Sequence, residues 1–279
     1  MTGPTTGSER IVLAHGGGGQ LTDELIDEHV LPRLGNAVLN ELLDSAILQV
    51  EAGRVAMTID SYVVDPWRFP GGDIGRIAVC GTVNDLAVAG ARPRGLALSL
   101  IVAEGFPVAD LDTVLDSAAA AAGEAGVRVV TGDTKVVGAE HGPSIFVTTA
   151  GVGSVADELA LGPDRIEPGD RVLINGPVAD HGLAVMLARE MPEVRSVLRS
   201  DAAALNGLVA ALLAKVPDVR FMRDATRSGL AGVAAELARQ SGRRITLDES
   251  RIGVRPEARH AADMLGLDPL EVANEGKLV

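Results

Sequence analysis

Four aspartates stand where carboxylates could gather around a metal ion. Three flank apolar runs typical of strands and the fourth lies inside a helical pattern; they are Asp44, Asp60 and Asp133, and then Asp85. Each one alone is most simply a turn former or a solvent-facing residue, because aspartate often caps turns. Carboxylate oxygens from separate loops are, however, the ligands that Mg²⁺ prefers, and Mg²⁺ usually carries nucleotide phosphates. If the fold brings the four together, they predict a magnesium–nucleotide site.

Asp85 is unusual because it falls inside a predicted helix, where aspartate has no favourable propensity. At about 100° per residue, its face of that helix is shared by residues with small side chains: Ala78, Gly81, Thr82 and Ala89. Small neighbours leave room for a ligand to approach the carboxylate.

Three polar segments could contact phosphate. The run His-Gly-Gly-Gly-Gly at 15–19 could present backbone N–H groups, since glycine permits close approach and positive φ. It lacks the Lys-Ser/Thr ending of a Walker A loop, and a flexible hinge is equally compatible with it. Residues 132–135, Gly-Asp-Thr-Lys, put a carboxylate, a hydroxyl and an ammonium in one predicted turn. Residues 223–229 precede a predicted helix, whose N-terminal dipole favours an anion, although both segments could also be only capped turns.

Cysteine and histidine offer little chemistry here. Cys80 is the one cysteine, so an internal disulfide and a zinc knuckle are excluded. Its apolar neighbours in a predicted helix are typical of a core thiol rather than a nucleophile. Four histidines without metal-ligand spacing are predicted to be surface or capping residues: His29, His141, His181 and His260.

Hydrophobic periodicity predicts the elements that must hold these residues. In the first half it predicts a helix over 22–31 that stops at Pro32, a hairpin of strands 46–50 and 54–59, a helix over 73–89, a strand over 95–102, a helix from 108 to about 126, and strands 127–130 and 144–152. Asp73 stands where an N-cap belongs, and Gly90 where a C-terminal glycine belongs. This order favours an antiparallel or mixed sheet with helices on one face.

A domain boundary is expected at 162–170, where Gly-Pro and Pro-Gly-Asp interrupt the pattern. Beyond it we expect helices over 181–189, 200–215, 228–239 and 256–265, and strands over 171–175 and 244–247. Residues 277–279 resemble the start of a further strand, which suggests truncation.

Composition narrows the class of protein. The chain has 279 residues, about two domains at ~150 residues each. Hydrophobic residues make up 47% and aromatic residues only 2%, which predicts a core of small aliphatic side chains rather than disorder. A net charge of −13 without a long basic patch argues against nucleic-acid binding. No apolar run reaches the ~18 residues of a membrane span, and the first ten residues lack the apolar core of a signal peptide, so a cytoplasmic location is expected.

Five segments together resemble the HypE family of hydrogenase maturation proteins, which are carbamoyl dehydratases. They are residues 58–64, 70–75, 81–87, 90–93 and 132–137, of which Pro-Gly-Gly-Asp-Ile-Gly and Gly-Asp-Thr-Lys-Val-Val are specific to that family. The likeness runs from His15 to the last residue. The family belongs to the PurM-like superfamily of ATP-using enzymes, with aminoimidazole ribonucleotide synthetase, selenophosphate synthetase and thiamine-monophosphate kinase.

The resemblance implies an α/β (α+β) fold of two halves. We expect a glycine-rich segment and helix over 1–40, an ATP-binding and dimerisation domain over 41–155, and an incomplete C-terminal α/β domain over 165–279. In this family the mixed sheet of the first half dimerises into a barrel, and ATP lies in a groove at the interface of the homodimer.

The resemblance also implies a reaction. ATP phosphorylates the oxygen of a thiocarboxamide on a C-terminal cysteine of the protein itself. Loss of phosphate and protons then leaves a thiocyanate, the source of the cyanide ligands of the nickel–iron hydrogenase iron. The carbamoyl group comes from the HypF carbamoyltransferase, and the cyano group passes to the HypC–HypD complex.

Carried over residue by residue, the family's motifs assign roles in this chain. The implied Mg²⁺ ligands are Asp44, Asp60, Asp85 and Asp133. The implied ATP-binding residues are Gly17, Gly18, Asn84, Gly132, Asp133, Thr134 and Asp224. Lys135 and Glu275 match the proton-handling pair beside the thiocarboxamide, in which the carboxylate acts as a base through the amine.

The end of the chain departs from the family pattern. The family ends in a Pro-Arg-Ile-Cys tail, whereas this chain ends at Val279, so we expect either a fragment or an early stop, without the acceptor thiol. Two other functions stay open: a non-catalytic dimeric ATP-binding scaffold, and another PurM-like kinase or synthetase. Selenophosphate synthetase is the weaker rival, because residues 16–19 contain no cysteine.

Overall fold

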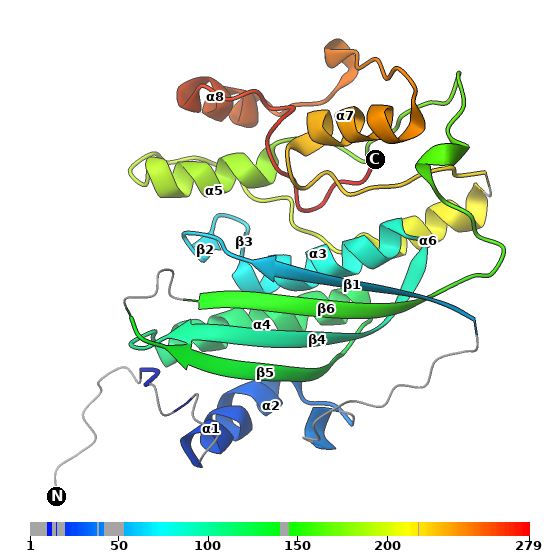
Figure 1. Ribbon diagram of the computed structural model, residues 1–279. Helices are drawn as coiled ribbons and strands as arrows, with labels where there is room; N and C mark the ends of the chain where they lie inside the picture. The colour runs from blue at the N-terminus through cyan, green and yellow to red at the C-terminus, as the bar shows by residue number, and fades with distance from the viewer. Residues whose placement is uncertain are drawn as a thin grey trace, which may run out of the picture.

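The computed structural model describes residues 10–12, 15, 20–37, 39–41, 53–139, 145–216 and 218–279. Asp44, Gly17, Gly18, His141 and the predicted strand 46–50 lie outside the described residues. In Figure 1 the first half forms the sheet and the helices behind it, and the second half lies above them as a layer of helices and extended chain.

A mixed four-stranded sheet organises the first half, as predicted. Its strands are β1 (Arg54–Tyr62), β4 (Ala91–Ala103), β5 (Val129–Val137) and β6 (Ile145–Val155), in the spatial order β1-β6-β4-β5. β4 and β5 are parallel, whereas β6 is antiparallel to both of its neighbours. The short strands β2 (Arg68–Phe69) and β3 (Gly72–Asp73) form a separate hairpin.

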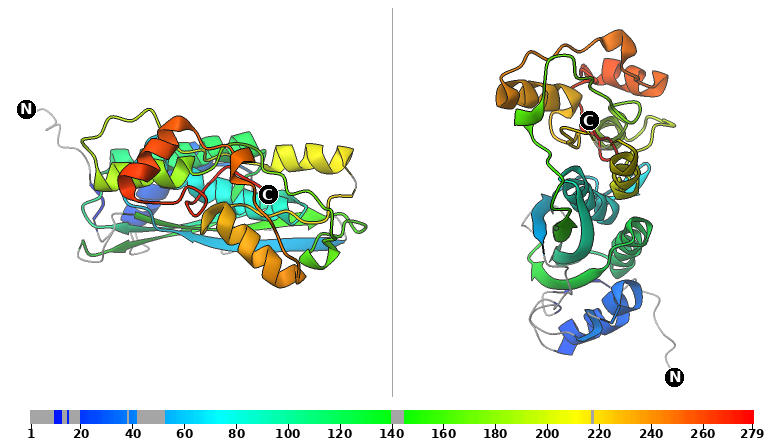
Figure 2. Two further views of the ribbon diagram at one scale, coloured as in Figure 1. Left: turned by 90° about the horizontal axis from the view of Figure 1, so that it is seen from above. Right: turned by 90° about the vertical axis from the view of Figure 1, so that its right-hand side faces the viewer.

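Two helices cover one face of this sheet (Figures 1 and 2), α3 (Ile74–Val88) and α4 (Val108–Ala125). The predicted ends of α3 are confirmed: Asp73 accepts the N–H of Arg76 at 3.0 Å, and Gly90 follows with φ +74°. The helices approach closely, since a Cβ at Gly75 would lie 2.2 Å from the carbonyl oxygen of Val114.

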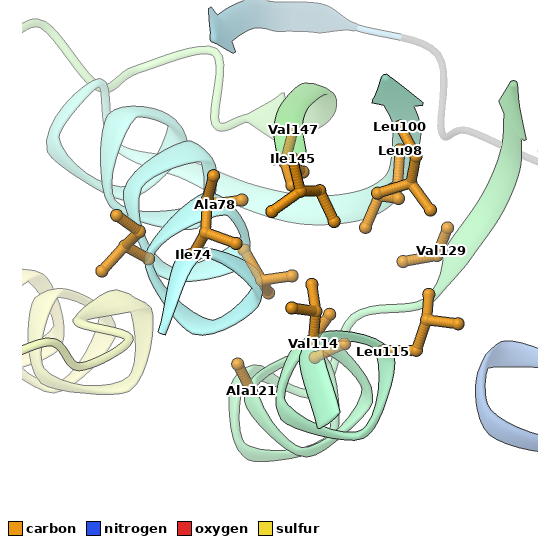
Figure 3. Close-up of a cluster of buried hydrophobic side chains, with 14 of the residues drawn as sticks. Ile74, Ala78, Leu98, Leu100, Val114, Leu115, Ala121, Val129, Ile145 and Val147 are labelled. Carbon is orange, nitrogen blue, oxygen red and sulfur yellow. The ribbon is translucent and has the colours of Figure 1, made fainter. Parts of the chain in front are cut away.

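The core between these layers is built from small aliphatic side chains, as the composition predicts. Figure 3 shows the side chains that the two helices and the sheet contribute: Ile74, Ala78, Leu98, Leu100, Val114, Leu115, Ala121, Val129, Ile145 and Val147, all of them buried. Burying each larger aliphatic side chain stabilises the fold by about 1.5–3 kcal/mol.

The strands run longer than predicted, and this changes where two aspartates sit. β1 continues to Tyr62 and pairs with β6 along its whole length, so Asp60 lies inside the strand rather than after it. β5 continues through Gly132 to Val137, so residues 132–135 form a strand and not a turn. A Cβ at Gly132 would lie 2.3 Å from the carbonyl oxygen of Leu98, so this glycine permits close strand approach.

The N-terminal helix also differs from its prediction, because it does not stop at Pro32. It comprises α1 (Gln20–Leu25), a π-helical turn η2 (Ile26–Val30) and α2 (Leu31–Leu34), followed by the 3₁₀ turn η3 (Leu39–Glu41). Pro32 stands in the first turn of α2, directly after the π-helical turn. His29 and Arg33 bind Asp112 of α4 at 2.7 Å and 3.0 Å, which docks this helix on the core.

The second half contains the helices α5 (Asp180–Glu190), α6 (Asn206–Lys215), α7 (Gly229–Ser241) and α8 (Pro256–Leu265), and the 3₁₀ turns η4 (Pro163–Arg165) and η5 (Glu249–Arg251). α6 starts six residues later than predicted, at Asn206 instead of Ser200. The predicted strands 171–175 and 244–247 have no ladder partners among the described residues. Near the chain end, Leu278 pairs with Asp224 only as an isolated bridge.

The second face of the sheet carries exposed apolar side chains. Val55, Met57 and Ile59 alternate along β1 on that face and are 52%, 78% and 67% exposed. Such a row of large apolar side chains is uncommon on a free surface and indicates an association face. Separately, no helix in the described part of the chain is long and apolar enough to cross a membrane.

Candidate functional site

A cavity of about 1000 Å³ opens where the two halves meet. β1 and α3 form the side that belongs to the first half, while α5, α7 and residues 267–275 form the side that belongs to the second half. Its polar lining includes Asp60, Tyr62, Asp85, His181, Asp224, Arg227 and Glu275. The cavity therefore collects three of the predicted aspartates and the predicted proton-handling glutamate.

Asp85 and its neighbours form an acidic group. Thr58 of β1 donates its hydroxyl proton to Asp85 Oδ2 at 2.7 Å. The pKa of Asp85 is raised to about 6, mainly by burial; the hydrogen bond from Thr58 lowers it and the nearby charges of Asp224 and Asp60 raise it. Such carboxylates favour a proton or a metal cation between them.

Tyr62 and Gly81 explain why the face of α3 near Asp85 consists of small residues. The Tyr62 hydroxyl donates to Asp60 Oδ2 at 3.2 Å. A Cβ at position 81 would lie 2.0 Å from the Tyr62 hydroxyl oxygen, so only glycine leaves room for it. Tyr62 thereby orients the Asp60 carboxylate toward the cavity, a role that sequence reasoning did not find.

Glu275 is the deepest carboxylate of the cavity lining, with 8% of its surface exposed. Burial raises its pKa well above the usual range, and Asp224, Asp201 and nearby acids raise it further. Its backbone N–H donates to Asp201 Oδ1 at 3.1 Å, and Asp201 in turn binds Lys277 at 2.7 Å. A buried carboxyl group with a raised pKa is a candidate for general acid–base chemistry.

Asn84, a predicted nucleotide contact, is buried and hydrogen-bonded within the chain. Its amide Nδ2 donates to the carbonyl oxygens of Ala203 at 3.0 Å and Glu275 at 3.3 Å, and its Oδ1 accepts the N–H of Leu205 at 2.7 Å. Both amide protons are thus used within the chain. Asn84 therefore ties α3 to the second half and holds the backbone of Glu275, and its contact with ATP stays a prediction.

Asp133, Thr134 and Lys135 lie away from the cavity. β5 and β1 are the two ends of the sheet among the described strands, three strand spacings or about 14 Å apart. Ser99 and Ile101 of β4 pair with Asp133 and Lys135, so these two side chains share the exposed face with Ile101, whereas Asp60 points to the α3 face. Within one chain, Asp133 does not join Asp60, and Lys135 does not reach Glu275.

Lys135 and Asp133 instead form their own weak pair. Their charged atoms lie 3.5 Å apart, and the side chains of Lys135 and Asp133 are 61% and 60% exposed. An exposed pair of this kind contributes little stability.

The predicted four-aspartate metal set is not assembled by one chain. In the described residues, no group of three or more His, Cys, Asp or Glu side chains is arranged to hold a metal. Mg²⁺ commonly uses one or two protein carboxylates and completes its shell with phosphate oxygens and water. Asp60 and Asp85 fit that chemistry, because both line one cavity and the pKa of Asp85 is raised by burial and, to a smaller extent, by the charges of Asp224 and Asp60.

The segment before α7 contributes one exposed cation. Arg227 Nη2 lies 4.0 Å from Asp60 Oδ1, and its side chain is 89% exposed. Arg223, by contrast, is paired with Glu236 of α7. Arg227 is the residue of the predicted anion-binding turn that stays available at the cavity mouth.

We predict that divalent cation binding weakens as the pH falls through about 6, because protons compete for Asp85. Mn²⁺ titrations followed by electron paramagnetic resonance at several pH values measure this. Thr58→Val removes the hydrogen bond that lowers the pKa of Asp85, so it should move the midpoint to higher pH. If the pH midpoint of Mn²⁺ binding is the same in Thr58→Val and in the parent chain, the role of Asp85 is contradicted.

Two protein-family models and a curated relative match this chain. The AIR synthase related N-terminal domain matches residues 43–155, and the corresponding C-terminal domain matches residues 167–279. A carbamoyl dehydratase HypE of Azotobacter vinelandii is 51% identical over 269 residues, which are 96% of this chain and 79% of that protein.

Solved structures agree with the sequence relatives. A HypE structure in complex with ATP superposes with a TM-score of 0.92 at 43% identity, covering 96% of this chain and 79% of the other. A HypE–HypF complex matches with a TM-score of 0.78 at 41% identity, covering 93% of this chain and 83% of the other. Together with the acidic cavity between two α/β halves, these matches show that the chain belongs to the HypE family of carbamoyl dehydratases.

Proposed function

We propose that this chain uses ATP and Mg²⁺ to dehydrate a cysteine-bound thiocarboxamide to a thiocyanate during hydrogenase maturation. The phosphoryl group moves from ATP to the carboxamide oxygen, which then leaves as phosphate while the nitrogen loses two protons. The observation that carries the proposal is the cavity in which Asp60, Asp85 and Asp224 stand beside the buried Glu275.

The charge of the cavity supports a metal–nucleotide complex rather than a free nucleotide. Carboxylates repel phosphate, so a divalent cation must stand between them, where it neutralises the transferring phosphoryl group. Asp60 and Asp85 would hold that cation, with Asp60 oriented by Tyr62 and Asp85 by Thr58. Arg227 at the cavity mouth supplies a positive charge for the phosphates.

Glu275 would take the protons that the carboxamide nitrogen loses. Its raised pKa makes its carboxylate a stronger base, and Asn84 and Asp201 hold its backbone in place. Lys135 and Asp133 would act from a second copy of the chain, because their own sheet turns them to the exposed face. A contribution from the second copy would explain why the family motif at residues 132–137 lies away from the cavity of its own chain.

We predict a homodimer built on the exposed sheet face. Met57→Lys puts a charge in that interface and should shift the mass to a monomer at micromolar concentration, since a buried unpaired charge costs several kcal/mol. Met264→Lys on α8, which is 39% exposed, is the matched control and should stay dimeric. Light scattering gives both masses, and a monomeric parent chain would contradict the prediction.

The partners follow from the family. HypF, whose complex with a HypE protein matches this chain, would donate the carbamoyl group. The HypC–HypD complex would receive the cyano group, which its iron binds as cyanide.

The decisive experiment replaces Glu275 with glutamine in a chain that carries a family-type tail ending in cysteine. After loading by a HypF carbamoyltransferase and addition of ATP, intact-mass analysis should show the parent chain losing one water. Glu275→Gln should slow that loss by about 100-fold or more, in the range of a removed general base, while MgATP still binds. The exposed Glu158→Gln is the control. Equal dehydration by Glu275→Gln would refute the assignment, and ATP binding without dehydration by the parent would indicate a scaffold.

A further inference from the structure

The side of the cavity formed by α5 carries residues that take no part in the proposed phosphoryl and proton transfers. Its lining comprises His181, Gly182, Val185, Met186 and Arg189. Arg189 is already engaged, since its Nε donates to the carbonyl oxygen of Asp65 at 2.5 Å. The side is therefore mainly apolar, with the His181 ring as its one buried polar ring.

His181 is held in one orientation. Its Nδ1 lies 2.8 Å from Ser200 Oγ, and its ring meets the edge of Phe69 with centroids 5.3 Å apart at 85°. Ser200 is fixed in turn, because its N–H donates to the carbonyl oxygen of Pro70 at 2.8 Å. Only 6% of His181 is exposed, so the sequence-based expectation of a surface or capping residue is wrong.

The hydrogen bonds of Ser200 favour one tautomer of the His181 ring. Ser200 Oγ accepts the N–H of Ala202 at 3.1 Å, and its own proton has no other acceptor among the described residues than His181 Nδ1. Because the Ser200 hydroxyl proton has Nδ1 as its acceptor in this arrangement, we assign Nδ1 as the acceptor and place the hydrogen on Nε2. The Nε2–H group has no hydrogen-bond partner in the described part of the chain, while the residue lines the cavity.

The ring is also uncharged. Burial lowers the pKa of His181 to about 4, and the charge of Asp201 only partly opposes that. A neutral donor on an apolar surface matches a neutral carbonyl oxygen, whereas a phosphate would be bound better by a cation or a metal. The α5 side and the acidic side of the cavity therefore suit two different ligands.

We propose that the α5 side binds the uncharged, carboxamide-bearing substrate, with His181 Nε2–H donating to a carbonyl oxygen of that substrate. This inference rests on the proposed function and names the substrate subsite of the same cavity. His181 is a substrate-binding residue, and Ser200 positions it by fixing the ring tautomer.

A synthetic peptide ending in S-carbamoylcysteine tests the proposal, with calorimetry of the peptide and of MgATP measured separately. His181→Phe keeps the ring but removes the donor, and should weaken peptide binding at least tenfold while MgATP affinity changes less than twofold. His181→Gln places an amide N–H near the position of Nε2 and should restore binding to within about threefold. Ser200→Ala releases the tautomer and should give an intermediate loss.

Each outcome decides the inference. Equal peptide affinity in the parent chain and His181→Phe, parallel losses of peptide and MgATP, or no peptide binding by the parent would overturn it. Specific loss with glutamine rescue supports it. If the parent binds the peptide through His181 but never converts the carboxamide to a nitrile with ATP, the proposed function fails and the subsite remains.

Discussion

Replacing Asp85 with asparagine will remove Mg²⁺-dependent nucleotide binding and leave the fold intact. Asp85 is one of two carboxylates from which the cation would be held, and the second, Asp60, lies on a different element. Losing an outer-shell partner of a metal already costs roughly 10–100-fold in affinity, so losing a ligand should cost more than about 100-fold. Calorimetry with a non-hydrolysable ATP analogue, with and without Mg²⁺, measures the effect.

The stability of the same variant should move the opposite way. The pKa of Asp85 is raised from 3.8 to about 6 in the folded chain, so its contribution to stability is present at low pH and is lost as the pH rises through about 6. Asparagine does not ionise, so the variant avoids the destabilisation that ionised Asp85 causes above about pH 6. Its melting temperature at about pH 8 should therefore lie above that of the parent. The exposed Asp263→Asn on α8 should change neither quantity. Unchanged MgATP affinity in Asp85→Asn would remove Asp85 from the site.

The second large effect concerns the acceptor thiol. Incubating the 279-residue chain with a HypF carbamoyltransferase, carbamoyl phosphate and ATP should give no carbamoyl adduct. Its one thiol, Cys80, is completely buried in α3, and burial raises its pKa to about 12, so almost no thiolate forms at neutral pH. Intact-mass spectrometry gives an all-or-none result.

A matched pair of extended chains completes this test. An appended tail ending in Pro-Arg-Ile-Cys should accept one carbamoyl group and lose water with ATP, and the same tail ending in serine should do neither. Cys80→Ala in the cysteine-tailed chain should keep full modification. An adduct on the unextended chain would show that Cys80 is accessible and that the acceptor assignment is wrong.

Local signals in the sequence predicted the first half well. Asp73 and Gly90 fix the ends of α3 through backbone groups within a few residues, so the helix and the direction of Asp85 could be read directly. β5 was predicted too short because Gly132 suggests a turn, whereas its missing side chain serves the contact with Leu98 of the neighbouring strand. The residues next to Gly132 in the sequence do not show that the glycine is needed for contact with a distant strand.

The site itself depended on such distant contacts. The motif around Asn84 names the residue but not its partners, which lie at positions 203, 205 and 275. His181 has no spacing that separates a surface histidine from a buried one, and its partner Ser200 lies in a segment predicted to be helical. The resemblance to the HypE family supplied Glu275, which periodicity alone would not single out.

The fit between Tyr62 and Gly81 constrains which substitutions this chain can accept over evolutionary time. A methyl group at position 81 would occupy the place of the Tyr62 hydroxyl, so alanine becomes acceptable there only after residue 62 has shrunk or turned away. That first step abandons the hydrogen bond to Asp60. A lineage that keeps the tyrosine is thereby bound to keep the glycine, and the two positions should be inherited and lost as a pair.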